Sequence, residues 1–264
     1  MKPNINEVAA VVKAAADEIL LPAFGKVQRQ RKEDGSILTV ADMAMNDRLQ
    51  IVLASQWPEI DFLSEEMPDE PREKMLQART STFWILDPLD GTTNFAAGIP
   101  FFSVSLALYH QGDIILGVVY DPMRNECFFA QQNQPARLNG EVIAIKHTVS
   151  MLKQSVGIID LKRLKPGLAL RVIEETPVAS QRSFGSVALD WCWLAMGRGH
   201  VYLHGRQNVW DYGAGQLILR QAGGYSSNLT GQAVLNPQLQ PSAAVAACDA
   251  ALFEQWSRWL GILP

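Results

Sequence analysis

One stretch dominates this sequence, residues 84–95, which read WILDPLDGTTNF. The apolar run from Phe83 to Leu86 predicts a buried strand, and two carboxylates, Asp87 and Asp90, follow it directly. The proline and glycine beside them favour a turn. Because proteins with mixed helices and strands often present their chemistry where strands end, we expect a polar site at this point.

The residues after the turn suit an anion. Thr92, Thr93 and Asn94 are types that begin helices, and the backbone N–H groups of a helix start, together with that of Gly91, attract phosphate. Carboxylates repel phosphate, so the pattern makes sense when a cation lies between them. Oxygen ligands without neighbouring His or Cys favour Mg²⁺ over Zn²⁺. The alternative is an acidic turn that caps a helix and binds no metal.

Three further acidic positions are candidates to complete such a site. Glu65 follows a predicted strand at residues 60–63, and Asp42 and Asp211 stand where helices are expected to begin. Each has a simpler interpretation. Glu65 lies in an acid-rich segment that also fits a solvated loop, and an aspartate at a helix start is commonly a cap.

Composition excludes several functional classes. The chain has 264 residues, of which 48% are hydrophobic, so disordered and fibrous classes are excluded. Lys plus Arg is 23 and Asp plus Glu is 27, so the net charge is −4, which argues against nucleic-acid binding. We expect no signal peptide, transmembrane helix or membrane partner, since no apolar run reaches about eighteen residues. Three widely spaced cysteines predict a cytoplasmic protein without a disulfide framework.

The predicted elements change character near residue 150. The first part contains helices at about 8–20 and 41–56 and then strands, with a hairpin across Gln111-Gly112-Asp113. The second part alternates strands and helices. Its predicted strands are 156–159, 201–203 and 244–247, and its predicted helices are 187–196, 211–221 and 250–260. We therefore predict an α+β subdomain at 1–149 with the main metal motif, packed on an α/β subdomain at 150–264 that contributes Asp211 and substrate-side loops.

Taken together, three motifs resemble those of the inositol monophosphatase family. They are Glu65-Glu66, the stretch Asp87 to Phe95, and Trp210-Asp211-Tyr212-Gly213-Ala214-Gly215, in family order. Leu38-Thr39 with Asp42 resembles the upstream Thr-x-x-Asp element of that family. The resemblance implies a layered αβαβα fold of the inositol monophosphatase and fructose-1,6-bisphosphatase type. It also implies a homodimer and lithium-sensitive, Mg²⁺-dependent hydrolysis of a phosphate monoester such as inositol 1-phosphate.

The same resemblance implies roles for individual residues, with two or three Mg²⁺ per site. Glu65, Asp87 and the Leu89 carbonyl would hold the metal that carries the attacking water. Asp87, Asp90 and Asp211 would hold a second metal near the ester oxygen. Gly91 and Thr92 would bind phosphate, the Thr92 hydroxyl would orient the nucleophile, and Asp42 and Thr39 would stand behind it. The implied contacts to the rest of the substrate are Asp90, Asp211, Gly185, Ser186 and His204.

Departures from the family pattern leave the substrate open. His204 stands where inositol-specific members carry a glutamate that bonds sugar hydroxyls, although it also fits the end of the strand at 201–203. Arg31-Lys32 fills an early basic position, and Ser36 replaces an acidic residue common in the family. 3′-Phosphoadenosine 5′-phosphate, fructose 1,6-bisphosphate and histidinol phosphate remain alternative substrates. A binding partner of the transcription machinery on a phosphatase scaffold is an alternative of another class.

Cys192 and Arg198 have the Cys-x5-Arg spacing of cysteine-dependent phosphatases. That chemistry needs a reactive thiolate in a loop of backbone N–H groups. The apolar residues between the two positions instead predict a packed helix, so we interpret Cys192 as structural.

Overall fold

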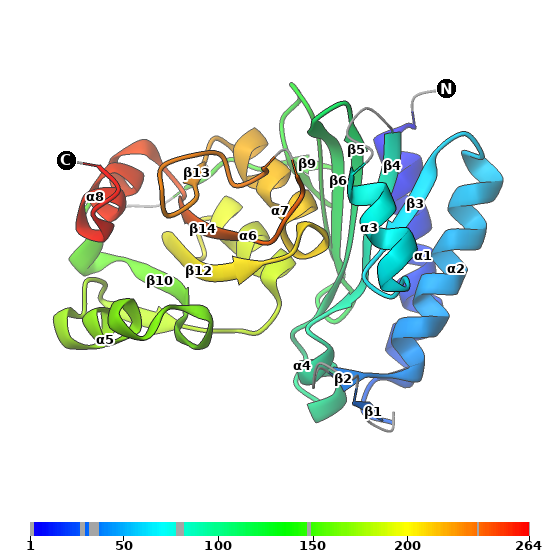
Figure 1. Cartoon of the computed structure of the whole chain (residues 1–264), viewed down its shortest axis with the longest axis horizontal. Helices are drawn as coiled ribbons and strands as arrows, with labels where there is room; N and C mark the ends of the chain where they lie inside the picture. The colour runs from blue at the N-terminus through cyan, green and yellow to red at the C-terminus, as the bar shows by residue number, and fades with distance from the viewer. Residues whose placement is uncertain are drawn as a thin grey trace.

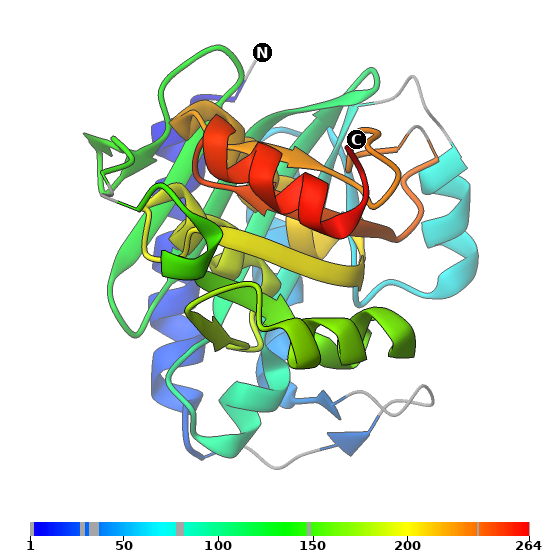
Figure 2. The same cartoon turned by 90° about the vertical axis from the view of Figure 1, so that its left-hand side faces the viewer.

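The protein is represented by a computed structural model that describes residues 3–26, 30–31, 37–77, 82–146, 149–236 and 238–263. Helices and sheets alternate in layers, helix–sheet–helix–sheet–helix, which confirms the predicted αβαβα arrangement (Figures 1 and 2). Lys32 and Ser36, noted above as family positions, lie outside the described residues. Within the described ranges, no helix combines the length and the apolar character needed to cross a bilayer.

The first sheet has seven strands in the order β3-β4-β5-β6-β7-β8-β9. Only the β3–β4 pair is parallel, and the other pairs are antiparallel. The predicted hairpin joins β5 to β6, where Gln111 and Gly112 both have positive φ. The strands are β3 (Asp61–Ser64), β4 (Thr82–Asp90), β5 (Ser103–His110), β6 (Asp113–Asp121), β7 (Glu126–Gln131), β8 (Arg137–Leu138) and β9 (Glu141–Val142).

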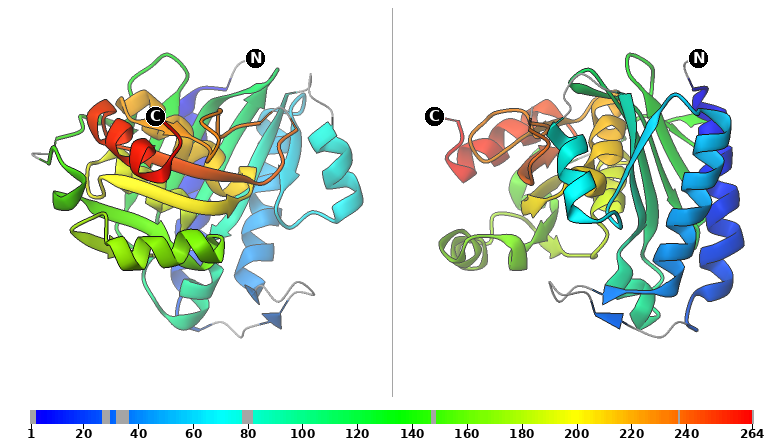
Figure 3. Two further views of the ribbon diagram at one scale, coloured as in Figure 1. Left: turned by 60° about the vertical axis from the view of Figure 1, so that its left-hand side comes forward. Right: turned by 45° about the vertical axis from the view of Figure 1, so that its right-hand side comes forward.

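Two amphipathic helices, α1 (Ile5–Ala23) and α2 (Val40–Gln56), cover the outer face of this sheet (Figure 3). Their apolar stripes pack on the side chains of β4, β5 and β6 that point outward, such as Trp84, Leu106 and Val118. A short antiparallel pair, β1 (Gln30–Arg31) and β2 (Ile37–Leu38), precedes α2.

The second sheet has five strands in the order β11-β10-β12-β14-β13. The helices α6 and α7 lie between the two sheets, whereas α5 and α8 pack on the outer face of the second sheet. The elements from residue 150 onward are η1 (Leu152–Gln154), β10 (Val156–Asp160), η2 (Leu161–Arg163), α5 (Pro166–Glu175), β11 (Ser180–Arg182), α6 (Val187–Ala195), β12 (Val201–Gln207), α7 (Val209–Ala222), β13 (Tyr225–Ser227), β14 (Ser242–Ala247) and α8 (Ala250–Leu260).

The middle layer is packed so closely that two glycines are required there. A Cβ on Gly117 of β6 would lie 2.8 Å from the Cα of Ala214, and one on Gly215 would lie 2.6 Å from the Cβ of Trp191. Helix α7 therefore rests directly on the first sheet and on α6. Residues from both halves of the chain share this core cluster, and the subdomain boundary at 149/150 stays a prediction.

Several predicted elements differ from those observed. β4 continues through Asp90 rather than ending at Leu86, because β5 goes on pairing with it beyond a bulge between Asp87 and Asp90. The acid-rich segment after Glu65 also fits a solvated loop by its sequence, but part of it forms the helix α3 (Asp69–Gln77). A second short helix, α4 (Thr92–Ala97), follows β4.

Candidate active site

The site is built around the bulged end of β4. Asp87 pairs with Ser105 across the sheet and Asp90 with Ser103, so two residues of β4 stand opposite a single residue of β5 at the bulge. The Oδ1 atom of Asp87 accepts a hydrogen bond of 3.0 Å from the Leu89 N–H. This hydrogen bond holds the Asp87 carboxylate against the backbone of the bulge.

Gly91 closes the turn after β4. Its φ is 94°, in the left-handed region, and a Cβ there would lie 3.1 Å from the carbonyl oxygens of Gly185 and Phe101. Any side chain would therefore push two backbone segments apart. Thr92, which follows, is the first residue of α4, so Gly91 rather than a threonine holds the N-cap position.

Glu65, Asp87 and Asp211 converge although they come from three separate elements. Each offers a carboxylate oxygen, and these three atoms all lie within 4.8 Å of one another. The Glu65 N–H donates to the Leu86 carbonyl at 3.1 Å, which fixes the turn after β3 beside β4. Asp211 is the third residue of α7, where its Oδ2 accepts a 2.7 Å hydrogen bond from the Asn208 N–H. It is therefore both a helix cap and a member of the acidic trio.

The electrostatics of this trio are unfavourable for the protein alone. Burial raises the pKa of Asp87 well above its usual range, and the charges of Glu65, Asp90 and Asp211 raise it further. Burial also raises the pKa of Asp211 well above its usual range, again with Glu65 and Asp90 adding to the effect. Buried like charges at this spacing are stabilised by a cation. Three hard oxygen donors, with no His or Cys among them, fit Mg²⁺.

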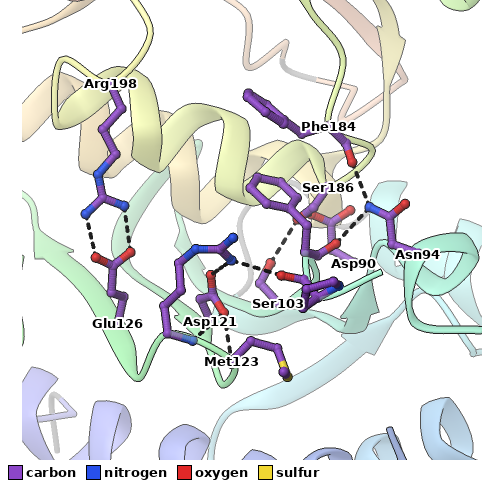
Figure 4. Close-up of polar contacts among 12 residues, drawn as sticks. Asp90, Asn94, Ser103, Asp121, Met123, Glu126, Phe184, Ser186 and Arg198 are labelled. Carbon is purple, nitrogen blue, oxygen red and sulfur yellow. Dashed lines mark hydrogen bonds and ion pairs between the residues drawn. The ribbon is translucent and has the colours of Figure 1, made fainter. Parts of the chain in front are cut away.

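Asp90 lies beside this trio but not within it. Its Oδ2 accepts a 2.6 Å hydrogen bond from the hydroxyl of Ser186, which lies beside it in Figure 4. It also accepts a 2.7 Å hydrogen bond from the Ala188 N–H. Burial raises its pKa to about 6, and these hydrogen bonds oppose the rise. Ser186 is fully buried and also contacts the Ser103 hydroxyl at 3.2 Å. In this arrangement Ser186 orients Asp90, and Gly185 lies against the Gly91 turn.

Thr39, Asp42 and Thr92 form the hydrogen-bonded series that the resemblance implied. The Oδ2 atom of Asp42 accepts a 2.6 Å hydrogen bond from the Thr39 hydroxyl and a 2.8 Å hydrogen bond from the Thr39 N–H. The Thr92 hydroxyl lies 3.2 Å from Asp42 Oδ1 and 2.9 Å from the Leu89 carbonyl. Burial raises the pKa of Asp42, while the hydrogen bonds from Thr39 and Thr92 oppose that rise.

His204 lies inside β12, so it does not end that strand as one interpretation of the sequence had it. It is buried, and its Nε2 is 3.5 Å from Asp160 Oδ2 at the matching position of β10. The hydrogen bond and charge of His204 lower the pKa of Asp160, although burial acts in the opposite direction. Its charge also acts on Asp90.

Asn94 is a site residue whose role sequence reasoning missed. Its Nδ2 donates to the Phe101 carbonyl at 2.8 Å and to the Phe184 carbonyl at 2.7 Å (Figure 4). The amide thus ties the turn after β4 to the segment that precedes Ser186. The sequence showed only a helix-capping residue type, because both acceptors are brought near by the fold.

The cysteine chemistry considered from the sequence is not supported. Cys192 is fully buried in α6, and burial raises the pKa of its thiol well above the usual range. Arg198 instead forms an ion pair with Glu126 at the molecular periphery (Figure 4). A reactive thiolate is exposed and has a lowered pKa, so Cys192 is structural, as predicted.

A family model described as "Inositol monophosphatase family" matches residues 2–258 of the chain. The chain belongs to the inositol monophosphatase family. Its members are metal-dependent phosphatases, and this member is accordingly a phosphoric monoester hydrolase. The match covers all the site residues described above.

Individual relatives agree with this assignment. This chain is 32% identical over 241 residues to the Nus factor SuhB of Pasteurella multocida, and the match covers 88% of this chain and 87% of that protein. It is 33% identical over 215 residues to the inositol-1-monophosphatase of Mesorhizobium japonicum, covering 79% of each. The crystal structure of the extragenic suppressor protein suhB from Bartonella henselae matches with a TM-score of 0.81 and 30% identity, over 96% of each chain.

Proposed function

We propose that the protein is a Mg²⁺-dependent phosphomonoesterase of a small polyol or sugar phosphate, of the inositol 1-phosphate type. The observation that carries the proposal is the convergence of Glu65, Asp87 and Asp211 beside the turn at Gly91. An acidic trio around the buried Asp87, next to a turn that suits phosphate, is useful to an enzyme that binds a cation and an anion together.

The residues divide into metal ligands and groups that handle the substrate. Glu65, Asp87 and the Leu89 carbonyl would hold one ion, and Asp87, Asp90 and Asp211 a second. When bound, the ions would acidify water and neutralise charge on the ester oxygens. Gly91 and Thr92 would contact the phosphate.

The Thr92 hydroxyl would orient the attacking water, and its hydrogen bonds support this role. A hydroxyl has one hydrogen to donate, and the distances from Thr92 to Asp42 and Leu89 allow that hydrogen to go to either acceptor. When it goes to Asp42, a lone pair of Thr92 is free to accept a hydrogen bond from water. Thr39 keeps Asp42 in place by occupying its other carboxylate oxygen.

The choice of substrate would depend on residues that contact the part of the substrate beyond its phosphate. His204 is held by Asp160 through an ion-pair contact of 3.5 Å, so we propose that the pair replaces the sugar-binding glutamate of inositol-specific members. Gly185 and Ser186 would lie near the substrate hydroxyls. Fructose 1,6-bisphosphate, histidinol phosphate and 3′-phosphoadenosine 5′-phosphate remain alternative substrates.

Phosphate release from these four compounds, with Mg²⁺ or with a chelator, tests the proposal. We expect release that requires Mg²⁺, is abolished in Asp211→Asn and is retained in Asp61→Asn, a control at an exposed acid on β3. Full activity of Asp211→Asn, or activity that resists the chelator, would contradict it. The compound with the highest kcat/KM identifies the substrate class.

A second candidate function is binding to the transcription machinery, and it is favoured by the relative named a Nus factor. This role predicts a partner that is retained by Asp87→Asn while phosphatase activity is lost. A pull-down with purified RNA polymerase, carried out with the wild-type protein and with Asp87→Asn, tests it. Absence of binding by the wild-type protein would contradict this second role.

Three further family properties are proposals for this chain. They are inhibition by lithium, assembly as a homodimer and a cytoplasmic location. Lithium inhibition of phosphate release and the mass in solution by light scattering test the first two directly.

A further inference from the structure

The turn that carries Glu65 needs support that β3 alone does not supply. Among the described strands, β3 is at the edge of its sheet and pairs with β4 alone. The Glu65 carboxylate faces two others, and its charge raises the pKa of both Asp87 and Asp211. This repulsion pushes Glu65 away from the position in which it lies.

Arg72 of α3 contacts this turn from the other side. Its Nη1 donates to the Glu65 carbonyl at 3.0 Å and to the Met67 carbonyl at 3.3 Å. The two acceptors lie on either side of Glu66, so one guanidinium nitrogen fixes the backbone of the whole turn. Hydrogen bonds from a charged donor are among the stronger ones in proteins.

The same guanidinium also contacts the segment that carries Asp211. It lies over the ring of Trp210, 5.3 Å from the centroid. Trp210 immediately precedes Asp211, and its carbonyl accepts a 2.9 Å hydrogen bond from the Ser105 hydroxyl of β5. Trp210 is therefore anchored to the first sheet, and Arg72 rests on that anchored ring.

We propose that Arg72 is a positioning residue that holds Glu65 beside Asp211 and thereby sets the metal affinity of the site. It connects the Glu65 turn to the start of α7, two segments that are distant in the sequence. The proposal rests on the proposed function, because it takes the trio to be the Mg²⁺ site.

The test measures Mg²⁺ binding by calorimetry and the Mg²⁺ dependence of phosphate release. Removing a group that orients metal ligands typically weakens metal binding by about 10- to 100-fold. We expect Arg72→Met to weaken Mg²⁺ binding by about tenfold or more, with kcat restored at saturating Mg²⁺. Arg72→Lys should lie between, since lysine keeps the charge and a nitrogen that can donate to the carbonyls but lacks the planar guanidinium that lies over the Trp210 ring.

Lys74→Met is the matched control, because Lys74 is an exposed cation on the same helix that pairs with Glu70. It should leave Mg²⁺ binding unchanged. A purely structural role would instead lower the melting temperature of Arg72→Met and its kcat at every Mg²⁺ concentration. Should Arg72→Met fail to fold by circular dichroism, Arg72→Lys and Arg72→Gln carry the same comparison.

Trp210→Leu separates the ring contact from the carbonyl contacts. If Arg72 acts through Trp210, the loss of Mg²⁺ binding free energy in the double variant with Arg72→Met should be smaller than the sum of the losses in the two single variants. Wild-type Mg²⁺ affinity in Arg72→Met overturns the role of Arg72 alone. Absence of Mg²⁺ binding by the wild-type protein overturns the metal site itself and this role with it.

Discussion

Asp87 and Asp121 are buried aspartates toward the ends of two strands of the same sheet, Asp87 three residues before the end of β4 and Asp121 at the end of β6, yet they have opposite surroundings. The Asp121 carboxylate accepts a 2.8 Å hydrogen bond from Arg124 Nη1 and hydrogen bonds from the N–H groups of Met123 and Arg124 (Figure 4). Burial raises its pKa, and these partners oppose the rise. Asp121 is thus a buried charge whose partners all come from the protein.

The charged groups around Asp87 are carboxylates like itself. Its carboxylate accepts a hydrogen bond from the Leu89 N–H, but burial raises its pKa, and the carboxylates of Glu65, Asp90 and Asp211 raise it further. A buried charge surrounded by like charges destabilises a fold unless something outside the chain compensates it. The contrast indicates that Asp121 serves the structure and that Asp87 serves a cation.

The largest expected difference between the two aspartates is in catalysis. Asp87→Asn should lower kcat/KM for phosphate release by about a thousandfold, because the stabilisation that a bound metal supplies is several kcal/mol and each 1.36 kcal/mol is tenfold. Asp121→Asn should remain within a few-fold of wild type in steady-state assays at saturating Mg²⁺. Equal losses in both variants would contradict the division of roles.

The next expected difference is in stabilisation by Mg²⁺. A ligand that binds only the folded state at about one hundred times its Kd adds about 2.7 kcal/mol. Mg²⁺ should therefore raise the melting temperature of the wild-type protein and of Asp121→Asn, whereas Asp87→Asn should lose most of this increment. The measurement is differential scanning fluorimetry with Mg²⁺ and with a chelator. The Mg²⁺ titration of Asp87→Asn itself shows how large any nonspecific effect of divalent salt is.

The sequence predicts more about the surroundings of Asp87 than about those of Asp121. The apolar run before Asp87 and the polar residues after it predicted a strand and a polar site. The meeting of Glu65 and Asp211 with Asp87 came from the family resemblance, because no local pattern shows that three distant segments converge. The pairing of Asp121 with Arg124 was not predicted, although the two are only three positions apart.

The same distinction explains the elements that sequence patterns missed. The helix α3 contains few apolar residues, and its Arg72 contacts two carbonyls and an aromatic ring that only the folded chain supplies. β4 was expected to end at Leu86, since Pro88 and Gly91 normally interrupt strands. Pairing with Ser103 beyond the bulge extends it. Local sequence therefore predicted the elements whose stability is local and missed those that depend on contacts from elsewhere.

The smallest expected difference is in stability without metal, and there the two aspartates should have effects of opposite sign. Asp121→Asn exchanges charge-assisted hydrogen bonds for neutral ones and leaves the Arg124 cation without its carboxylate partner. Hydrogen bonds to charged groups contribute about 1.5 to 3 kcal/mol, so a loss of about 2 kcal/mol is expected in urea unfolding with chelator present. Asp87→Asn keeps the shape of the side chain and removes one of the mutually repelling charges.

The free energy of unfolding of metal-free Asp87→Asn should accordingly equal or exceed that of metal-free wild type. A site evolved to bind a cation is less stable than a neutral one when the cation is removed, and the same substitution that abolishes activity should relieve this cost. Similar unfolding slopes in urea would show that the variants expose the same surface, so that the free energies can be compared. If Asp87→Asn instead destabilises the metal-free protein as much as Asp121→Asn does, Asp87 has a structural partner within the chain and the contrast between the two aspartates is wrong.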